Sequence, residues 1–390
     1  MEVHPPNGVG ADSVQLNDTF ILKDKDEDPS WIIGPRPGPY VEEHSRSIYM
    51  RLGARIGFLG IDARTERTRR QVNYPDTYDL IFKRVRSELS RTPDLNHLIL
   101  LLGIPIAYPR LIWLENILTS PIIGPIRFLS KRFGLAGGLF NKFDGQVDIL
   151  DDLDDHYTAH AHKHERKDLM LRLQALARDY SIRITILGGD VHLGALGRFY
   201  SKPKLRIPIE RDHRYMANVI SSAVTNHPPP MVVANLLARR NKIHHLDHET
   251  DETLMPFFDK DPGNSNKTGL FNHCTMPSRN YAIITENPPA ENAAPNGTAN
   301  GHFPDSDPVA HPHHMSRAER AEKDGHSFLG AGEEGAGTKH AAASGVHWGT
   351  LQGGLDVSLR VEIDGHDRDG TTEGYGFSIP SLRVGGKAGA

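Results

Sequence analysis

The sequence predicts an α/β fold in which flanking helices cover a layered, mainly parallel β-sheet. Apolar runs of strand length alternate along the chain with amphipathic runs of helical period. Their succession of strand, helix, strand, two helices and strand is typical of a parallel sheet with helices on its faces. Within residues 182–194, moreover, an apolar run ends in Gly188-Gly189 and then presents Asp190 and His192. In such sheets, functional side chains lie just beyond the carboxyl ends of the strands.

The first half of the domain predicts two strands and two helices. Residues 55–61 (RIGFLGI) form the first strand, which ends directly before Asp62. A second buried strand is expected at residues 97–106, because this run is continuously apolar. One helix, at 75–89, connects the two strands, and another follows at 109–118. The apolar face of the connecting helix comprises Tyr78, Ile81, Phe82, Val85 and Leu89.

The second half predicts a long helix, three strands and a hairpin. The helix spans residues 163–180 and leads directly into the strand that begins at residue 182. Further strands are expected at 216–222 and 279–285, where β-branched residues are enriched. Two alternating segments within residues 348–384 flank a turn rich in Gly and Asp. They predict a β-hairpin that docks back on the sheet.

Changes in composition divide the chain into segments. Residues 1–44 are rich in Pro, Gly and Asp and predict a linker. Residues 45–286 hold most of the periodic elements and predict one folded domain. Residues 287–347 have few aliphatic side chains, so they cannot bury enough apolar surface to offset the entropy of ordering, and they predict a disordered insertion. The hairpin then completes the domain, and residues 385–390 form a tail.

Composition also excludes several classes of protein. A net charge of −4 supplies no basic surface for nucleic acid, so we expect no nucleic-acid partner. Cys274 is the only cysteine, which excludes an internal disulfide and indicates a reducing compartment. No signal peptide is recognisable, so we expect a cytoplasmic protein. The longest apolar run, 98–107, is about half of the roughly 20 residues that a spanning helix needs, and peripheral association with a membrane surface stays open.

Asp190 and His192 are the strongest candidates for metal ligands. A carboxylate suits a hard cation and can bridge two ions, and an imidazole suits iron, zinc or manganese. The glycines before them let the backbone turn sharply and approach an ion closely. The alternative is an aspartate that closes a turn and a histidine that faces solvent. Taken in isolation, the short pattern GD-x-H favours that alternative.

Four segments, taken in this order and spacing, resemble the PhoD-like phosphatases. These phosphatases belong to the calcineurin-like metallophosphoesterase superfamily, and the resemblance is to their fungal branch. The segments are GIDARTERTR (60–69), DDLDDHYTAHAHKHER (151–166), ILGGDVHLGALGRFYS (186–201) and NVISSAVTN (218–226). The resemblance extends over residues 28–286. It implies a metallophosphoesterase-like fold that hydrolyses a phosphoester substrate at a two-metal site, with Asp190 and His192 among the ligands.

The resemblance leaves both the metal and the activity open. It implies divalent or mixed ions, of iron, calcium, manganese or zinc. The ligand motifs that the family collects earlier in its domain do not occur before Arg55, so the chain resembles the C-terminal half only. A catalytically incomplete fragment that acts as a binding or membrane-associated module is therefore the alternative to an enzyme. A sheet without its first strands would expose an edge, so an oligomer or a membrane-bound form is also expected.

Arginines near the end of the first strand are candidates for phosphate binding. Arg64 and Arg67 lie in the segment D-A-R-T-E-R, and a guanidinium matches phosphate oxygens in geometry. The structural alternative is that Asp62 pairs with an arginine and fixes the loop. We assign Arg64 to catalysis and Arg67 to substrate binding.

Three residues from other segments complete the predicted site. Asp155 and His156 end an acidic run, which either borders the site or caps the following helix in solvent. Asn226 ends a run of small polar residues that suits contacts to an oxyanion but equally suits a simple turn. We assign Asp155 to the metal, His156 to catalysis and Asn226 to substrate binding.

Overall fold

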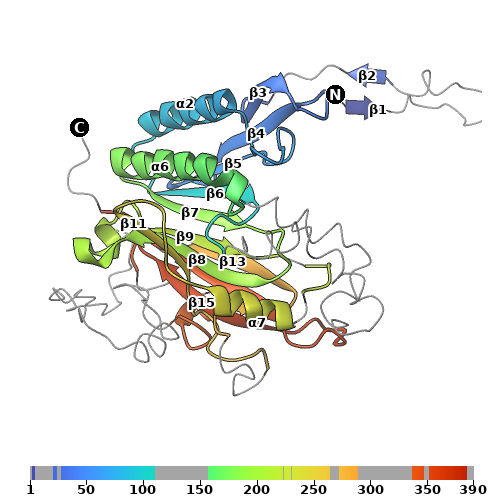
Figure 1. The fold of residues 1–390 in the computed structure, drawn as a ribbon, viewed down its shortest axis with the longest axis vertical. Coiled ribbons are helices and arrows are strands. Elements are labelled where there is room, and N and C mark those ends of the chain that lie inside the picture. The colour runs from blue at the N-terminus through green and yellow to red at the C-terminus, as the bar shows by residue number, and fades with distance from the viewer. Residues whose placement is uncertain are drawn as a thin grey trace, which may run out of the picture.

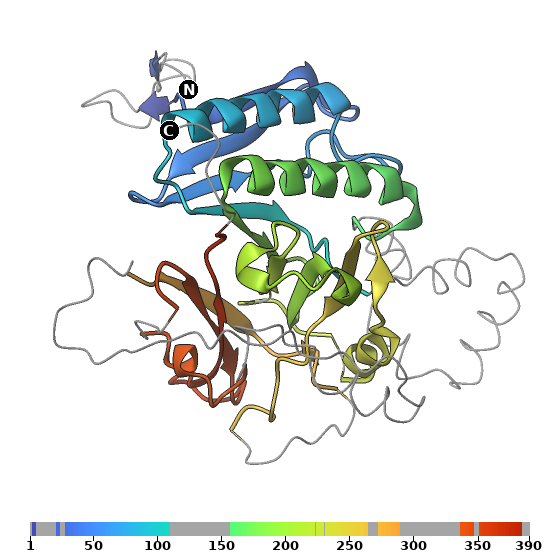
Figure 2. The ribbon, with the colours of Figure 1, turned by 90° about the vertical axis from the view of Figure 1, so that its left-hand side faces the viewer.

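The structure is a computed structural model. It describes residues 2–4, 21–23, 28–109, 157–222, 224–229, 231–263, 272–288, 336–346 and 351–383. Three layers make up the fold: two long helices, a large mixed sheet and a small second sheet (Figures 1 and 2). The predicted α/β fold class is therefore confirmed.

The large sheet has ten strands, and nine of them follow the order β10-β11-β8-β9-β7-β6-β5-β4-β3. The tenth strand, β12, pairs with β8 beside this path. Their bounds are β3 Trp31–Pro37, β4 His44–Arg51, β5 Ile56–Gly60, β6 His97–Gly103, β7 Arg183–Gly188, β8 Gly194–Ser201, β9 Met216–Ile220, β10 His244–His245, β11 Thr250–Leu254 and β12 Thr275–Met276. A separate antiparallel pair is formed by β1 (Glu2–His4) and β2 (Ile21–Lys23).

Parallel pairing is confined to the centre of the large sheet. β5, β6, β7 and β9 run parallel to one another. The sequence predicts this for the first three, whose continuous apolar runs are typical of parallel strands that are buried on both faces. On both flanks the pairing is antiparallel: β4 and β3 continue from β5, and β8 and β11 continue from β9. The sheet is therefore mixed rather than mainly parallel.

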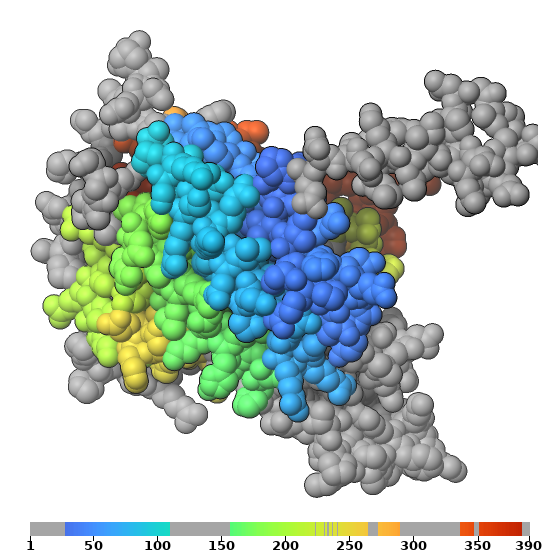
Figure 3. All heavy atoms as spheres, turned by 90° about the horizontal axis from the view of Figure 1, so that it is seen from above, coloured from blue at the N-terminus to red at the C-terminus, as the bar shows by residue number. Residues whose placement is uncertain are grey.

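Two helices, α2 (Pro75–Arg91) and α6 (Lys163–Tyr180), cover one face of this sheet (Figure 2). Proline at the first position of α2 suits its fixed φ, and Ser181 ends α6 in a left-handed conformation. Their apolar faces pack on Leu98, Leu100 and Ile184 in one buried cluster. Seen from above, the atoms of residues 28–109, in blue to cyan, and the green atoms that follow residue 157 form this surface side by side (Figure 3).

The shorter helices lie between the strands. The described elements are α7 Met231–Arg240 and the 3-10 helices η1 His160–His162, η2 Pro203–Leu205, η3 Ile209–Arg211 and η5 Ala341–Ser344. α7 contacts β12, and the sequence did not predict it. Within the described ranges, no helix combines the length and apolar character needed to cross a bilayer.

The predicted hairpin belongs to a second sheet on the opposite face. β14 (Leu355–Glu362) and β15 (Thr372–Ile379) pair antiparallel, as predicted, and β13 (Asn280–Glu286) pairs with the other side of β14. Their inward side chains share a buried cluster with Ile99 and Val219 of the large sheet. The hairpin thus packs on the face of the large sheet without extending its edge (Figure 2).

The prediction of a linker over residues 1–44 is wrong for its last part, because β3 forms there and β4 begins at His44. Two features concealed these strands. β3 contains prolines, which an edge strand tolerates because one side of it does not join the ladder. In β4 the inward positions 45 and 47 hold serine in place of aliphatic residues, and Ser45 donates to the buried carboxylate of Glu66 at 2.6 Å.

The prediction of disorder over residues 287–347 is wrong for its C-terminal end. Gly337 pairs with Gly376 of β15, and η5 packs against the same strand. Any side chain larger than hydrogen at 374 or 376 would overlap the backbone of Ala343, so these two glycines form the cradle in which η5 lies. Residues 289–335 lie outside the described residues, as does most of the helix predicted at 109–118.

We expect acid to destabilise this fold through His97. Its Nε2 donates to the Gly353 carbonyl oxygen at 2.6 Å, and burial lowers the pKa of His97 from 6.5 to about 4. Between these values the unfolded chain takes up a proton that the folded protein excludes, so stability falls as pH drops from 6.5 to 4. The expected loss is on the order of 3 kcal/mol.

Urea unfolding between pH 7 and 4 measures this loss. His97→Gln keeps a donor toward the Gly353 carbonyl oxygen without a titrating ring and should reduce the pH dependence, whereas the exposed-site variant His366→Gln should not. Identical slopes for wild type and His97→Gln would contradict the assignment.

The glycine cradle gives a second prediction. Gly374→Ala places its methyl group against the Ala343 carbonyl oxygen and should destabilise the fold by roughly 1–3 kcal/mol. Gly365→Ala adds the same methyl in an exposed turn, where the nearest atom is the end of Arg279 at 3.2 Å, and should change stability by less than about 0.5 kcal/mol. Thermal unfolding compares the two variants, and equal shifts would mean that η5 does not pack on β15.

Candidate functional site

The loops that follow the central parallel strands meet at one edge of the large sheet. Their backbones are tied together directly. The amide of Ile61 donates to the Leu101 carbonyl at 3.0 Å, and that of Gly189 donates to the Gly103 carbonyl at 2.9 Å. Ser221 donates in the same way to Gly188 at 3.0 Å. Polar side chains on the loops after β5, β7 and β9 therefore share one rigid platform, where ligands of α/β sheets bind.

The loop after β7 holds Asp190 and His192 in an unusual backbone conformation. Both residues have left-handed φ angles, 71° and 53°, with Val191 between them. The left-handed region costs a residue with a Cβ roughly 1–2 kcal/mol, and such costs concentrate where function requires a fixed geometry. Glycine precedes them because a Cβ at Gly188 would lie 3.1 Å from the Pro105 Cα atom.

Predicted residues from three loops come together around this turn. A guanidinium nitrogen of Arg64, after β5, lies 3.5 Å from an Asp190 carboxylate oxygen. The amide nitrogen of Asn226, after β9, lies 3.3 Å from His192 Nε2. Arg64 and Asn226 were both assigned to the site from the sequence, and the structure brings each against one of the two candidate ligands.

Asp62 organises the loop that carries Arg64. Its carboxylate accepts the backbone amides of Arg46, Arg64 and Thr65 at 2.9–3.0 Å and the Thr65 hydroxyl at 2.6 Å. Burial acts to raise the pKa of Asp62, but these hydrogen bonds outweigh it and hold that pKa below its ordinary value. Asp62 thus fixes the loop, as the structural alternative expected. It does so by binding backbone amides and a hydroxyl, and not, among the described residues, by pairing with an arginine side chain.

Two further carboxylates, of Glu66 and Glu165, stabilise the same loop and the residues that follow it. Glu66 is fully buried and accepts from Ser45, from the Thr77 hydroxyl at 2.7 Å and from the Tyr74 amide at 2.7 Å. Glu165 of α6 accepts the amides of Val72 and Asn73 at 2.8 and 2.9 Å. Arg67 is half-buried, and its charge partly opposes the burial that raises the pKa of Tyr157. Its predicted role in substrate binding stays a prediction.

The structure describes two of the three metal ligands predicted from the sequence, Asp190 and His192. The third, Asp155, lies outside the described residues, as does His156, which was assigned to catalysis. Across the part of the chain that the structure describes, no three His, Cys, Asp or Glu side chains lie close enough to hold a metal ion. Asp190 and His192 offer one oxygen-donating and one nitrogen-donating group, a combination that fits Mn, Fe or Zn in chemistry but not in number.

Asn280 is a site residue that sequence reasoning missed. It begins β13 in the second sheet, and its side chain contacts the loop after β9 at Ser221 and Ser222. The Ser222 hydroxyl in turn accepts the backbone amide of His192 at 3.1 Å. The serines stood out in the sequence as a polar strand end, but nothing local to Asn280 indicates a contact with residues 58 positions away.

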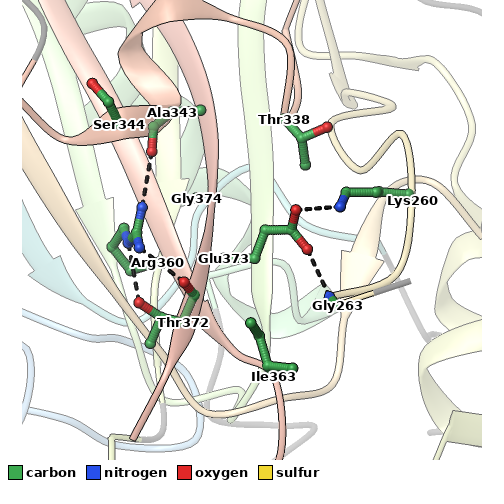
Figure 4. A pocket seen from close by; sticks show the side chains of 10 residues that line it. All are labelled: Lys260, Gly263, Thr338, Ala343, Ser344, Arg360, Ile363, Thr372, Glu373 and Gly374. Carbon is green, nitrogen blue, oxygen red and sulfur yellow. Dashed lines mark hydrogen bonds and ion pairs between the residues drawn. The ribbon is translucent and has the colours of Figure 1, made fainter. Parts of the chain in front are cut away.

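An open pocket on the second sheet lies apart from this edge (Figure 4). The positively charged side chains that line it already have partners within the protein. Arg360 donates to the Ala343 and Thr372 carbonyls at 3.0 and 2.9 Å, and Lys260 pairs with Glu373. These contacts hold η5 and the loop at Lys260 against β15, so we interpret the pocket as packing between segments.

A family model matches the part of the chain that forms this edge of the sheet. The family model described as PhoD related phosphatase matches residues 45–124 and 126–305, which include the β5, β7 and β9 loops. The chain belongs to this family. The resemblance predicted from the sequence is thereby confirmed.

One curated relative and one solved structure add context. The chain is 41% identical over 293 residues to the uncharacterized protein YGR266W of Saccharomyces cerevisiae. The alignment covers 71% of this chain and 41% of the yeast protein, so the chain spans about two fifths of that relative's length. A solved structure titled "Structure of PhoD" aligns with a TM-score of 0.27 and 9% identity, over 47% of this chain and 30% of that one.

The left-handed conformation of His192 makes a testable prediction. His192→Gly and His192→Ala both remove the imidazole, but only alanine keeps the steric cost at φ 53°. The glycine variant should therefore be the more stable of the two by about 1 kcal/mol. At Ser221, where φ is not positive, the order should reverse, with alanine the more stable by roughly 0.5 kcal/mol. Denaturant unfolding of the four variants gives the order, and alanine above glycine at 192 would sink the assignment.

Proposed function

We propose that this chain is the phosphoester-hydrolysing part of a metal-dependent phosphatase or phosphodiesterase. The observation that carries the proposal is the convergence of Arg64, Asp190, His192 and Asn226 from three strand-end loops. An anion-binding arginine beside the candidate metal ligand Asp190 supports this chemistry, because substrates of α/β enzymes bind at this edge of the sheet. Membership of the PhoD-related phosphatase family supports the same chemistry.

Asp190 and His192 are the residues that would hold a divalent metal. Both residues belong to one short left-handed turn, and the Ser222 hydroxyl holds its backbone at the His192 amide, which would reduce the entropy lost when an ion binds. When bound, such an ion supplies hydroxide at neutral pH and neutralises charge on phosphate oxygens. We propose Asp155 as a further ligand and His156 as the acid that protonates the leaving group.

In this proposal, Arg64 exchanges its contact with Asp190 for a contact with the substrate phosphate. Its side chain is 66% exposed, and its contact with Asp190 is 3.5 Å long. A surface pair of this kind is worth roughly 0–1 kcal/mol, so a phosphate that accepts two hydrogen bonds from the guanidinium can replace it at little cost. Asn226, which contacts His192, and Arg67, further along the β5 loop, would bind the remaining phosphate oxygens.

A specific observation also favours a second function, that of a binding module. On the face of the large sheet that carries the second sheet, Trp31, Ile48, Gly60 and Leu101 stand in register across β3 to β6. Trp31 and Leu101 are 39% and 40% exposed. An apolar row of this kind suits a protein or membrane surface, and the described residues alone contribute only two metal ligands.

Hydrolysis of bis-p-nitrophenyl phosphate with added Mn²⁺ tests the primary proposal. Asp190→Asn and His192→Ala should each lower kcat/KM on the order of 100-fold or more, because each removes a metal ligand. Arg64→Ala should mainly raise KM, about tenfold, and Arg64→Lys should recover only part of that loss.

The surface variant His366→Ala, in the exposed turn between β14 and β15, is the matched control and should retain wild-type turnover. Activity of the wild type that persists in Asp190→Asn would overturn the assigned site. A wild type without turnover under any divalent metal would favour the binding module, which liposome flotation and light scattering then test.

A further inference from the structure

A buried asparagine of the second sheet contacts the proposed site from behind. Asn280 is the first residue of β13 and is only 3% exposed. It lies 54 residues beyond Asn226, outside the four segments that resemble the phosphatase family. Through its contacts with Ser221 and Ser222 of the loop after β9, it connects the second sheet to the candidate ligands. The inference below rests on the proposed function and deepens it.

Asn280 uses both ends of its amide on this loop. Its Oδ1 accepts from the Ser221 hydroxyl at 3.0 Å and from the Ser222 amide at 3.1 Å. Its Nδ2 donates to the carbonyls of Ser222 and Ser278 at 2.7 and 2.8 Å. These contacts use both donors and both acceptor sites of the side chain, so the orientation of the amide is fixed.

Ser222 transmits this orientation to His192. Asn280 binds both the amide and the carbonyl of Ser222, which leaves the Ser222 hydroxyl at a defined point in space. That hydroxyl accepts the His192 backbone amide at 3.1 Å, and Asn226, four residues along the same loop, contacts the His192 ring. The strained turn at His192 is thus held at its backbone and at its imidazole by one loop, and Asn280 fixes that loop.

We propose that Asn280 is a positioning residue, which acts through Ser222 to hold His192, a proposed metal ligand, in its left-handed conformation. Without the amide, the Ser222 backbone loses its partners, and the hydroxyl no longer stabilises a conformation that His192 disfavours. The expected consequence is a turn that samples other conformations and a weaker, less specific metal site.

Asn272 provides a matched control for the variant Asn280→Ala. It is buried to a similar degree, 4% exposed, and its side chain accepts from the Thr275 amide and hydroxyl at 3.1 Å and donates to Asn235 at 3.0 Å. Asn272→Ala therefore reports the general cost of deleting a buried amide in this part of the fold. Ser222→Ala and Ser222→Thr test the intermediate step, because only threonine keeps the hydroxyl.

Hydrogen exchange of the His192 amide in the full, metal-free chain is the first readout. We expect exchange at least tenfold faster in Asn280→Ala and Ser222→Ala than in wild type, and near wild-type exchange in Ser222→Thr and Asn272→Ala. Mn²⁺ titration is the second readout, with about tenfold weaker binding in Asn280→Ala and Ser222→Ala but not in the other two variants. Turnover of bis-p-nitrophenyl phosphate should fall through kcat more than through KM.

Unchanged exchange at His192 in Asn280→Ala, or an equal increase in Asn272→Ala, would overturn the inference and leave Asn280 a structural residue. If wild type neither binds Mn²⁺ nor hydrolyses the ester, the proposed function fails, but the exchange comparison still decides the role of Asn280. Should Asn280→Ala fold poorly, the Ser222→Ala and Ser222→Thr pair gives the same comparison at the next step of the chain.

Discussion

The buried guanidinium of Arg183 is the interaction on which the rest of this fold depends. Arg183 begins β7 and is 1% exposed, and it donates to the carbonyls of Ile209, Asp212, Tyr215 and Pro380 at 2.6–2.9 Å. A desolvated charge is costly unless its donors are satisfied, so these segments must converge on it. One side chain thereby connects the segment before β9 and the residue after β15 to the central strand β7.

The same strand is anchored at one end and strained at the other. Arg183 fixes the start of β7, whereas Asp190 and His192 follow its end in left-handed conformations. Apolar neighbours on both faces stabilise the strand between, and this stability can offset the local strain. Contacts from two other loops also hold the turn: Arg64 contacts Asp190, and Ser222 of the β9 loop accepts the His192 amide.

Hydrophobic periodicity was sufficient to predict the parts of this fold whose core positions are aliphatic. The bounds of α6 and the first residue of α2 agree with the sequence prediction, and so do the centres of β5 to β7. Periodicity failed at β4, because its inward serines belong to a buried polar network that has no apolar pattern: Ser45 donates to Glu66, and Ser47 accepts the Asp62 amide. For the site, Arg64 and Asn226 could be predicted from their places after strands. Asn280 could not, because its role depends on how the second sheet packs against the first.

The second sheet is therefore part of the domain that carries the site. Its strands share one buried cluster with the large sheet, so the core of the domain continues beyond residue 286. Its first strand begins with Asn280, which binds Ser221 and Ser222, so the β9 loop also contacts the second sheet. Two hydrogen bonds, one between Asn280 and Ser222 and one between Ser222 and His192, connect the second sheet to the candidate site. If Asn280 acts as proposed, a change in the packing of the C-terminal sheet alters the geometry at His192 through this connection.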